Sequence, residues 1–226
     1  MEKLKEQIVN ISKLLYDRGL VVATDGNVSA RLSKDKILIT PRGKCKGFLK
    51  SDEIVVIPLV GALRLRRTRP EGRERNPITS YQSPITGLKP SSEYKMHLEV
   101  YKQRKDVNAV IHTHSPFATA FSTTRKPLKP LLAETILMGG EIPCAKFATP
   151  STDEVPKSIS KWIKTHDSLL LANHGVLAIG KSLEEAFFQA ERVEFLAKVN
   201  FLARILGGGK ELSKKDIEEL KRMIQS

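Results

Sequence analysis

The chain has 226 residues, of which 40% are hydrophobic and 28% are charged, and its formal net charge is +13. This length and composition are typical of one domain with a sizeable core, and the sequence lacks the run of about eighteen apolar residues that a membrane-spanning helix needs. The positive charge would suit nucleic acid, but aromatic residues make up only 6% and no RNA-binding motif is present, so we do not expect a nucleic-acid partner.

The hydrophobic pattern predicts alternating strands and helices. Apolar residues recur at helical spacing over residues 2–18, and Gly19 ends that amphipathic helix. A last helix begins at Ser213, which resembles one half of a capping box with Asp216. Between them we expect strands at 27–32, 36–40, 54–58, 108–113, 168–172 and 176–180, and helices at 91–104, 116–124, 152–165 and 182–206. This alternation predicts a layered α/β fold.

Residues 61–88 interrupt the pattern. The segment is rich in Arg, Pro and Ser and has little periodicity, and residues 64–75 contain six arginines and two glutamates, a local net charge of +4. We interpret 61–88 as an exposed, mobile loop inserted into a single domain that spans residues 1–226.

The strand predicted at 108–113 ends in two histidines one residue apart, His112 and His114. Alternate side chains of a strand point to the same face, so both imidazoles would face one point, as zinc ligands do. Ser115 and Pro116 then begin a helix, with Ser115 as its N-cap. Such pairs also occur at solvated strand ends, so the pair alone leaves both interpretations open.

A third histidine ligand can be sought among the remaining histidines. His174 lies in an Asn-His-Gly turn between two apolar strands, which would hold its ring rigidly. It is our first choice, the alternative being a turn histidine bonded to the backbone. We interpret His166 as solvated. His97 we interpret as a surface residue that contacts Glu93 one helical turn away, although a metal-binding pair would have the same spacing.

Glu93 follows Pro-Ser-Ser at the start of a predicted helix. Free backbone N–H groups and the helix dipole favour a negative charge there. Glu93 is therefore either a carboxylate that stabilises the helix start or a general base beside a metal. The spacing does not choose between the two roles.

Four segments of the chain are informative when they are taken in order. They are 25–31 (Asp-Gly-Asn-Val-Ser-Ala-Arg), 39–43 (Ile-Thr-Pro-Arg-Gly), 90–93 (Pro-Ser-Ser-Glu), and 112–114 (His-Thr-His) with 173–175 (Asn-His-Gly). Together they resemble the class II (zinc-dependent) aldolase and adducin-like family, which includes L-fuculose-1-phosphate aldolases. The resemblance covers nearly the whole chain apart from the insert, and its specificity comes from the order of the motifs rather than from any one of them.

The resemblance implies a role for each matching residue. His112, His114 and His174 would bind Zn²⁺, one ion per chain, and Glu93 would be the catalytic acid–base and would approach the metal in the empty site. The remaining residues would hold the substrate phosphate, which agrees with the affinity of glycine backbone, small hydroxyls and helix N-termini for phosphate. These residues are Gly26, Asn27, Thr40, Gly43, Ser91 and Ser92.

The resemblance also implies the fold and the reaction. The fold would be a three-layer α/β/α structure with a central, mostly antiparallel sheet, assembled as a homotetramer with sites at subunit interfaces. The reaction would be reversible cleavage of a ketose 1-phosphate to dihydroxyacetone phosphate and an aldehyde such as lactaldehyde. An L-ribulose-5-phosphate 4-epimerase or a methylthioribulose-1-phosphate dehydratase could use the same scaffold. A non-catalytic protein and a basic RNA-binding protein remain weaker alternatives.

Some residues depart from the family pattern. Arg42 stands where a small hydroxyl residue is usual, and it could add a bidentate phosphate contact or point away. Some aldolases of the family have a tyrosine from a neighbouring subunit just before the segment that matches 139–143. No tyrosine lies there in this chain, and Glu134 lies near that place instead, either as a second acid–base group or as a structural carboxylate. Only two cysteines, Cys45 and Cys144, and no apolar leader are present, so we expect a cytoplasmic protein.

Overall fold

A seven-stranded sheet forms the centre of the computed structural model, which describes residues 1–59 and 87–225. The strand order is β3-β2-β1-β4-β7-β6-β5, and every neighbouring pair is antiparallel except β5 with β6. The strands are β1 (Asn27–Arg31), β2 (Lys36–Ile39), β3 (Val55–Pro58), β4 (Ala109–Thr113), β5 (Cys144–Ala145), β6 (Ser168–Leu171) and β7 (Gly175–Gly180).

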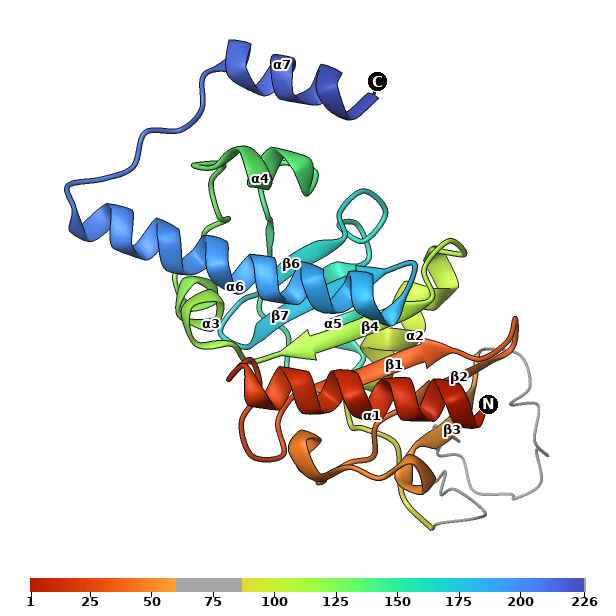
Figure 1. The fold of residues 1–226 in the computed structure, drawn as a ribbon. Coiled ribbons are helices and arrows are strands. Elements are labelled where there is room, and N and C mark those ends of the chain that lie inside the picture. The colour runs from red at the N-terminus through yellow and green to blue at the C-terminus, as the bar shows by residue number, and fades with distance from the viewer. Residues whose placement is uncertain (60–86, 226) are drawn as a thin grey trace.

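Helices cover both faces of the sheet (Figure 1). On one face, α1 and α6 pack on β1, β4 and β7 through Ile8, Leu15 and Ala186. On the other face, α2 and α5 pack through Tyr101 and Ile159. The helices are α1 (Glu2–Asp17), α2 (Tyr94–Gln103), α3 (Pro116–Thr123), α4 (Ala133–Leu137), α5 (Glu154–Ile159), α6 (Leu183–Ile205) and α7 (Lys214–Gln225). The predicted three-layer α/β/α fold with a mostly antiparallel sheet is confirmed.

Alternation along β4 decides where its first histidine points. Ile111 packs with α1 and α6, whereas Val110 packs with α2 and α5. His112 lies two residues after Val110 and therefore faces the α2 side of the sheet. The start of α2, where Glu93 lies, is on that same side.

Two helices differ from their predicted bounds. Helix α2 begins at Tyr94 rather than at 91, and Glu93 occupies its N-cap. Helix α5 ends at Ile159 rather than at 165, because the amide of Trp162 bonds to the carbonyl of Ile159, three residues back, and the chain tightens into turns.

The cap of α3 is also different from the prediction. Ser115 occupies the N-cap, but its hydroxyl makes no capping bond. The carboxylate of Glu194, on α6, accepts hydrogen bonds from the amides of Phe117 and Ala118 at 3.0 and 2.8 Å instead. A residue far along the chain thus satisfies the helix start, which short-range spacing could not reveal.

The predicted insert at 61–88 lies outside the described residues except for its last two positions. None of the helices within 1–59 and 87–225 is long and apolar enough to cross a membrane. The capping box of Ser213 and Asp216 at the start of α7 is present, with reciprocal bonds of 3.1 and 3.2 Å.

Candidate metal centre

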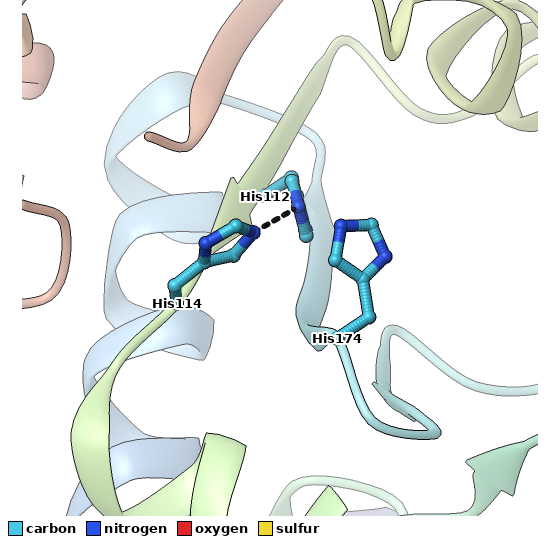
Figure 2. Close-up of side chains that lie close together, drawn as sticks. All are labelled: His112, His114 and His174. Atoms are coloured by element: carbon cyan, nitrogen blue, oxygen red, sulfur yellow. Dashed lines mark hydrogen bonds between the residues drawn. The ribbon is translucent and has the colours of Figure 1, made fainter. Parts of the chain in front are cut away.

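Three histidines from distant parts of the chain converge on one point (Figure 2). His112 lies on β4, His114 just beyond its end, and His174 in the turn that joins β6 to β7. The Nε2 atoms of His112 and His114 are 3.0 Å apart, and one ligand nitrogen from each of the three rings lies within 4.8 Å of the others. The structure therefore brings together the three predicted ligands.

Hydrogen bonds fix how the first two rings present their nitrogens. His112 Nδ1 donates to the carbonyl oxygen of Val176 at 2.8 Å, and His114 Nδ1 lies 3.3 Å from Asp25 Oδ2. With a proton on each Nδ1, both Nε2 atoms carry lone pairs, and these face one another across 3.0 Å. Two such lone pairs repel unless a cation lies between them, and tetrahedral zinc holds nitrogens roughly 3.3 Å apart. The donor set thus fits a metal ion.

Burial favours the neutral form of His112 and His174, which is the form that binds a metal. Burial lowers the pKa of His112 well below its ordinary value, and the neighbouring histidines lower it further. Burial also lowers the pKa of His174. Neutral rings offer free lone pairs near neutral pH, so the site is prepared for a cation rather than for an anion.

The turn at 173–175 needs its particular residues. Asn173 has a φ of +54°, in the left-handed region that asparagine tolerates better than most residues. A Cβ atom on Gly175 would collide with the carbonyl oxygen of Thr113 and would lie 2.9 Å from Cδ2 of His114. Glycine therefore allows the turn to approach β4 closely, and this approach brings His174 to the other two rings.

Glu93, which was also predicted to approach the metal, lines the same cavity as the three histidines but is not in the group whose ligand atoms lie within 4.8 Å of one another. Its side chain is only 8% exposed, and its Oε1 accepts a hydrogen bond of 2.9 Å from the hydroxyl of Ser151. Its Oε2 is buried and has no hydrogen-bond partner among the described residues. A buried carboxylate oxygen without a partner, in the same cavity as three imidazoles, is available to a metal or to a proton.

The cavity has a volume of about 310 Å³, large enough for a small phosphorylated molecule. Five of the six residues predicted for the phosphate lie on its wall, namely Gly26, Asn27, Gly43, Ser91 and Ser92. The sixth, Thr40, is fully buried behind the wall, where its hydroxyl accepts a hydrogen bond from the amide of Val28 at 3.2 Å. Gly26 has a φ of +69°, and an added Cβ would lie 2.8 Å from the carbonyl oxygen of His112.

Two cationic side chains line the cavity. Arg42 is exposed there, and Lys46 is 2% exposed, with Nζ donating to the carbonyls of Thr24 and Lys44 at 2.7 Å each. Burial lowers the pKa of Lys46 to about 8, so its ammonium group stays largely protonated at neutral pH. No sequence pattern distinguishes Lys46 from the many other lysines of the chain.

The surface position predicted for His97 is wrong. Its ring is fully buried between α2 and β1, where Nε2 donates to Asn27 Oδ1 and Nδ1 accepts from the hydroxyl of Ser29 at 2.6 Å. The oxygen of Ser29 lies 2.9 Å from the hydroxyl of Tyr101, which completes the network. Because its carbonyl oxygen is engaged by His97, Asn27 has its amide NH₂ group left to offer a ligand in the cavity that this residue lines.

The buried ring of His97 predicts a pH-dependent stability. Burial lowers its pKa to about 3, whereas in the unfolded chain it is about 6.5, so the unfolded state binds more protons as the pH falls. The stabilisation is complete above the unfolded pKa and is lost as the pH falls towards the folded pKa. Between about pH 6.5 and about pH 4.5, the wild type should lose about 2.5 kcal/mol more unfolding free energy than His97→Gln.

Urea unfolding of both proteins at several pH values measures this difference. All other titrating groups are present in both proteins, so their contributions to the loss of unfolding free energy cancel in the comparison. Equal losses over this range would mean that His97 is not buried in its neutral form.

Besides Lys46, two residues of the site make contacts that the sequence patterns do not indicate. Ser151 reads as part of a Pro-Ser-Thr-Asp loop before a helix, and nothing in that run indicates a contact with Glu93 58 residues earlier. Asp25 belongs to a motif that was singled out, but its approach to His114 depends on the fold. By contrast, Glu134 lies on α4, and it is not among the described residues that line the cavity.

Comparisons with known proteins agree with this geometry. A family model described as the Class II Aldolase and Adducin N-terminal domain matches residues 6–201. The chain is 33% identical over 199 residues to an L-fuculose phosphate aldolase of Methanococcus maripaludis, covering 88% of this chain and 96% of that one. It is 28% identical over 226 residues to a 5-deoxy-D-ribulose 1-phosphate aldolase of Bacillus thuringiensis, covering 100% and 97%. Among solved structures, an L-fuculose 1-phosphate aldolase superimposes with a TM-score of 0.83 at 30% identity, covering 100% of this chain and 98% of that one.

Proposed function

Because the chain belongs to the class II aldolase and adducin family, we propose that it is a metal-dependent aldolase that reversibly cleaves a ketose 1-phosphate to dihydroxyacetone phosphate and an aldehyde. The observation that carries the proposal is the convergence of His112, His114 and His174 beside the free Oε2 of Glu93 in one cavity. Relatives named for different sugars leave the aldehyde open, and a lactaldehyde is our first choice.

We assign the metal to the three histidines, and their nitrogen donors favour zinc. A divalent cation held there supplies a Lewis acid that offsets negative charge on the substrate oxygens at the reacting carbonyl. His112 and His114 contribute by keeping their Nε2 lone pairs directed at one point through the bonds of their Nδ1 atoms. Glu93, which lines the same cavity, is the proposed additional ligand before substrate enters.

Glu93 is the proposed acid–base group. Cleavage of the C3–C4 bond leaves an electron pair on C3, so a proton must leave the C4 hydroxyl oxygen and a proton must be added at C3. Glu93 Oε2 carries a proton in this exchange, because Oε1 is already bonded to Ser151. Burial of the carboxylate keeps bulk water from competing for that oxygen.

The phosphate would bind at the other end of the cavity. The glycines and serines 91 and 92 offer small groups close to the start of α2, and Asn27 offers the amide NH₂ that His97 orients. The charges of Lys46 and Arg42 favour a dianion at this end. Thr40 supports this wall through its bond to Val28 and need not touch the substrate.

The proposal includes a homotetramer in the cytoplasm, with sites at subunit interfaces. Large apolar side chains on the exposed side of α6 would be covered by another copy of the chain. Free thiols such as Cys45 and Cys144 stay reduced in that compartment. The exposed side chains on α6 are Phe188, Phe195, Phe201, Leu202 and Ile205.

A coupled assay for dihydroxyacetone phosphate across a panel of ketose 1-phosphates tests the function. We expect triose phosphate release from at least one of them, abolished by a chelator and restored by zinc. No release with metal present would refute the aldolase. Metal-dependent conversion of L-ribulose 5-phosphate without triose release would indicate the epimerase, and dehydration of methylthioribulose 1-phosphate would indicate the dehydratase.

A further inference from the structure

Ser151 has a backbone conformation that serine rarely adopts. Its φ is +65°, in the left-handed region where a Cβ atom crowds the neighbouring carbonyl. The residue lies in the turn before α5, and it lines the cavity together with Pro150. Strain of this kind persists only where the surrounding structure imposes it.

The surrounding turn is tied down from several sides. The hydroxyl of Thr152 donates to the carbonyl of Thr149 at 2.7 Å, and the amide of Thr149 donates to the carboxylate of Glu154 at 2.9 Å. Asp153 forms an ion pair of 2.7 Å with Lys95 of α2, the helix that Glu93 caps. These contacts hold the turn against the start of α2.

The strained conformation has one visible result, the contact with Glu93. The hydroxyl of Ser151 donates to Oε1 at 2.9 Å, while Oε2 is buried without a partner among the described residues. The two oxygens of one carboxylate are therefore different. Oε1 is bonded to the protein, and Oε2 has no hydrogen-bond partner among the described residues of this cavity-lining side chain.

We propose that Ser151 is a positioning residue, which holds Oε1 of Glu93 so that Oε2 is the oxygen that exchanges the proton with the substrate. The inference rests on the proposed function of Glu93. A glutamate side chain has rotatable bonds and would otherwise sample orientations that turn Oε2 away from the reacting atoms. Proton transfer depends steeply on that orientation, so a single hydrogen bond contributes to turnover rather than to substrate binding.

Two variants separate the hydroxyl from the backbone strain. Ser151→Ala removes the hydroxyl and keeps the strain, whereas Ser151→Gly removes both. We expect both to lower kcat roughly tenfold with KM unchanged. Ser151→Gly should unfold a few degrees above Ser151→Ala, because glycine adopts a positive φ freely. The two variants should therefore have similar kcat values but different melting temperatures.

Thr152→Ala is the matched control. It deletes a hydroxyl from the same turn, one that bonds to Thr149 rather than to Glu93. It should lower the melting temperature and leave kcat near the wild-type value. If kcat followed melting temperature across the three variants, with Ser151→Gly recovering turnover, the effect would be on the turn as a whole and the proposal would be wrong.

A double-mutant cycle tests the contact without substrate. Ser151→Ala should lower the unfolding midpoint more in the wild-type background than in a Glu93→Ala background. Only in the wild-type background does the substitution remove the hydrogen bond between Ser151 and Glu93. A coupling energy of zero between Ser151 and Glu93 would overturn the inference. A measurable coupling energy together with a wild-type kcat in Ser151→Ala would also overturn it. A wild-type protein that released no triose phosphate would instead refute the proposed function, since the cycle reads the contact independently of any reaction.

Discussion

Glu93→Gln is expected to bind its metal normally and to lose turnover by about 10³-fold. Glutamine has nearly the same shape and can still accept the hydrogen bond from Ser151, but its amide cannot accept or release the proton. The loss should fall on kcat, with KM changed little, because the substituted atom acts in the transition state rather than in binding. Steady-state kinetics on the best ketose 1-phosphate, with metal content measured on the same sample, gives both quantities.

Glu134→Gln is the matched control for this substitution. Glu134 lies exposed on α4, and the cavity wall as described does not include it. This variant should keep wild-type kinetics, which would also remove Glu134 as a candidate second acid–base group. A Glu93→Gln enzyme with unchanged rate constants would exclude Glu93 from the mechanism.

His112→Ala is expected to abolish metal binding at micromolar metal and, with it, activity. His112 is buried, and its Nδ1 bond to Val176 directs Nε2 at the other two imidazoles. Two imidazoles and a carboxylate would remain, which should weaken zinc binding at least about 100-fold. Elemental analysis after dialysis should find about one zinc per wild-type chain and almost none in the variant.

Stability gives a second readout of the same substitution. Zinc at about 100 times its dissociation constant should stabilise the wild type by about 2.7 kcal/mol and leave His112→Ala unchanged. His166→Ala is the control, because that ring lies against Trp162, away from the other three. It should keep both the metal and the zinc-dependent stabilisation. An His112→Ala protein with full metal content and activity would refute the metal centre.

The sequence predicted those parts of the site whose geometry is local. The alternation of β4 placed His112 and His114 on one side, and the glycine turn placed His174 between two buried strands. The layered fold followed from the same patterns. In each case, the periodicity within one element determines which way its side chains point, and the tertiary structure keeps that direction.

What the sequence did not predict depends on contacts between distant segments. His97 has the spacing of a helix-surface residue, but the sheet packs against that side of α2, so the ring is buried beside Ser29. Glu194 caps α3 from 77 residues away, and Ser151 reaches Glu93 across 58 residues. Patterns among neighbouring residues contain no information about contacts between segments so far apart in the sequence.

His112 lies on β4 at the middle of the sheet, and His114 and His174 lie close beside its end, whereas another part of the cavity wall comes from the loop around Arg42. The central strands are fixed on both sides by neighbours, but loops accept substitution at little cost to folding. The strand that holds His112 and the loop that forms this part of the wall can therefore evolve separately in this scaffold. Replacing a few residues of that loop would reshape the cavity without rebuilding the central strands.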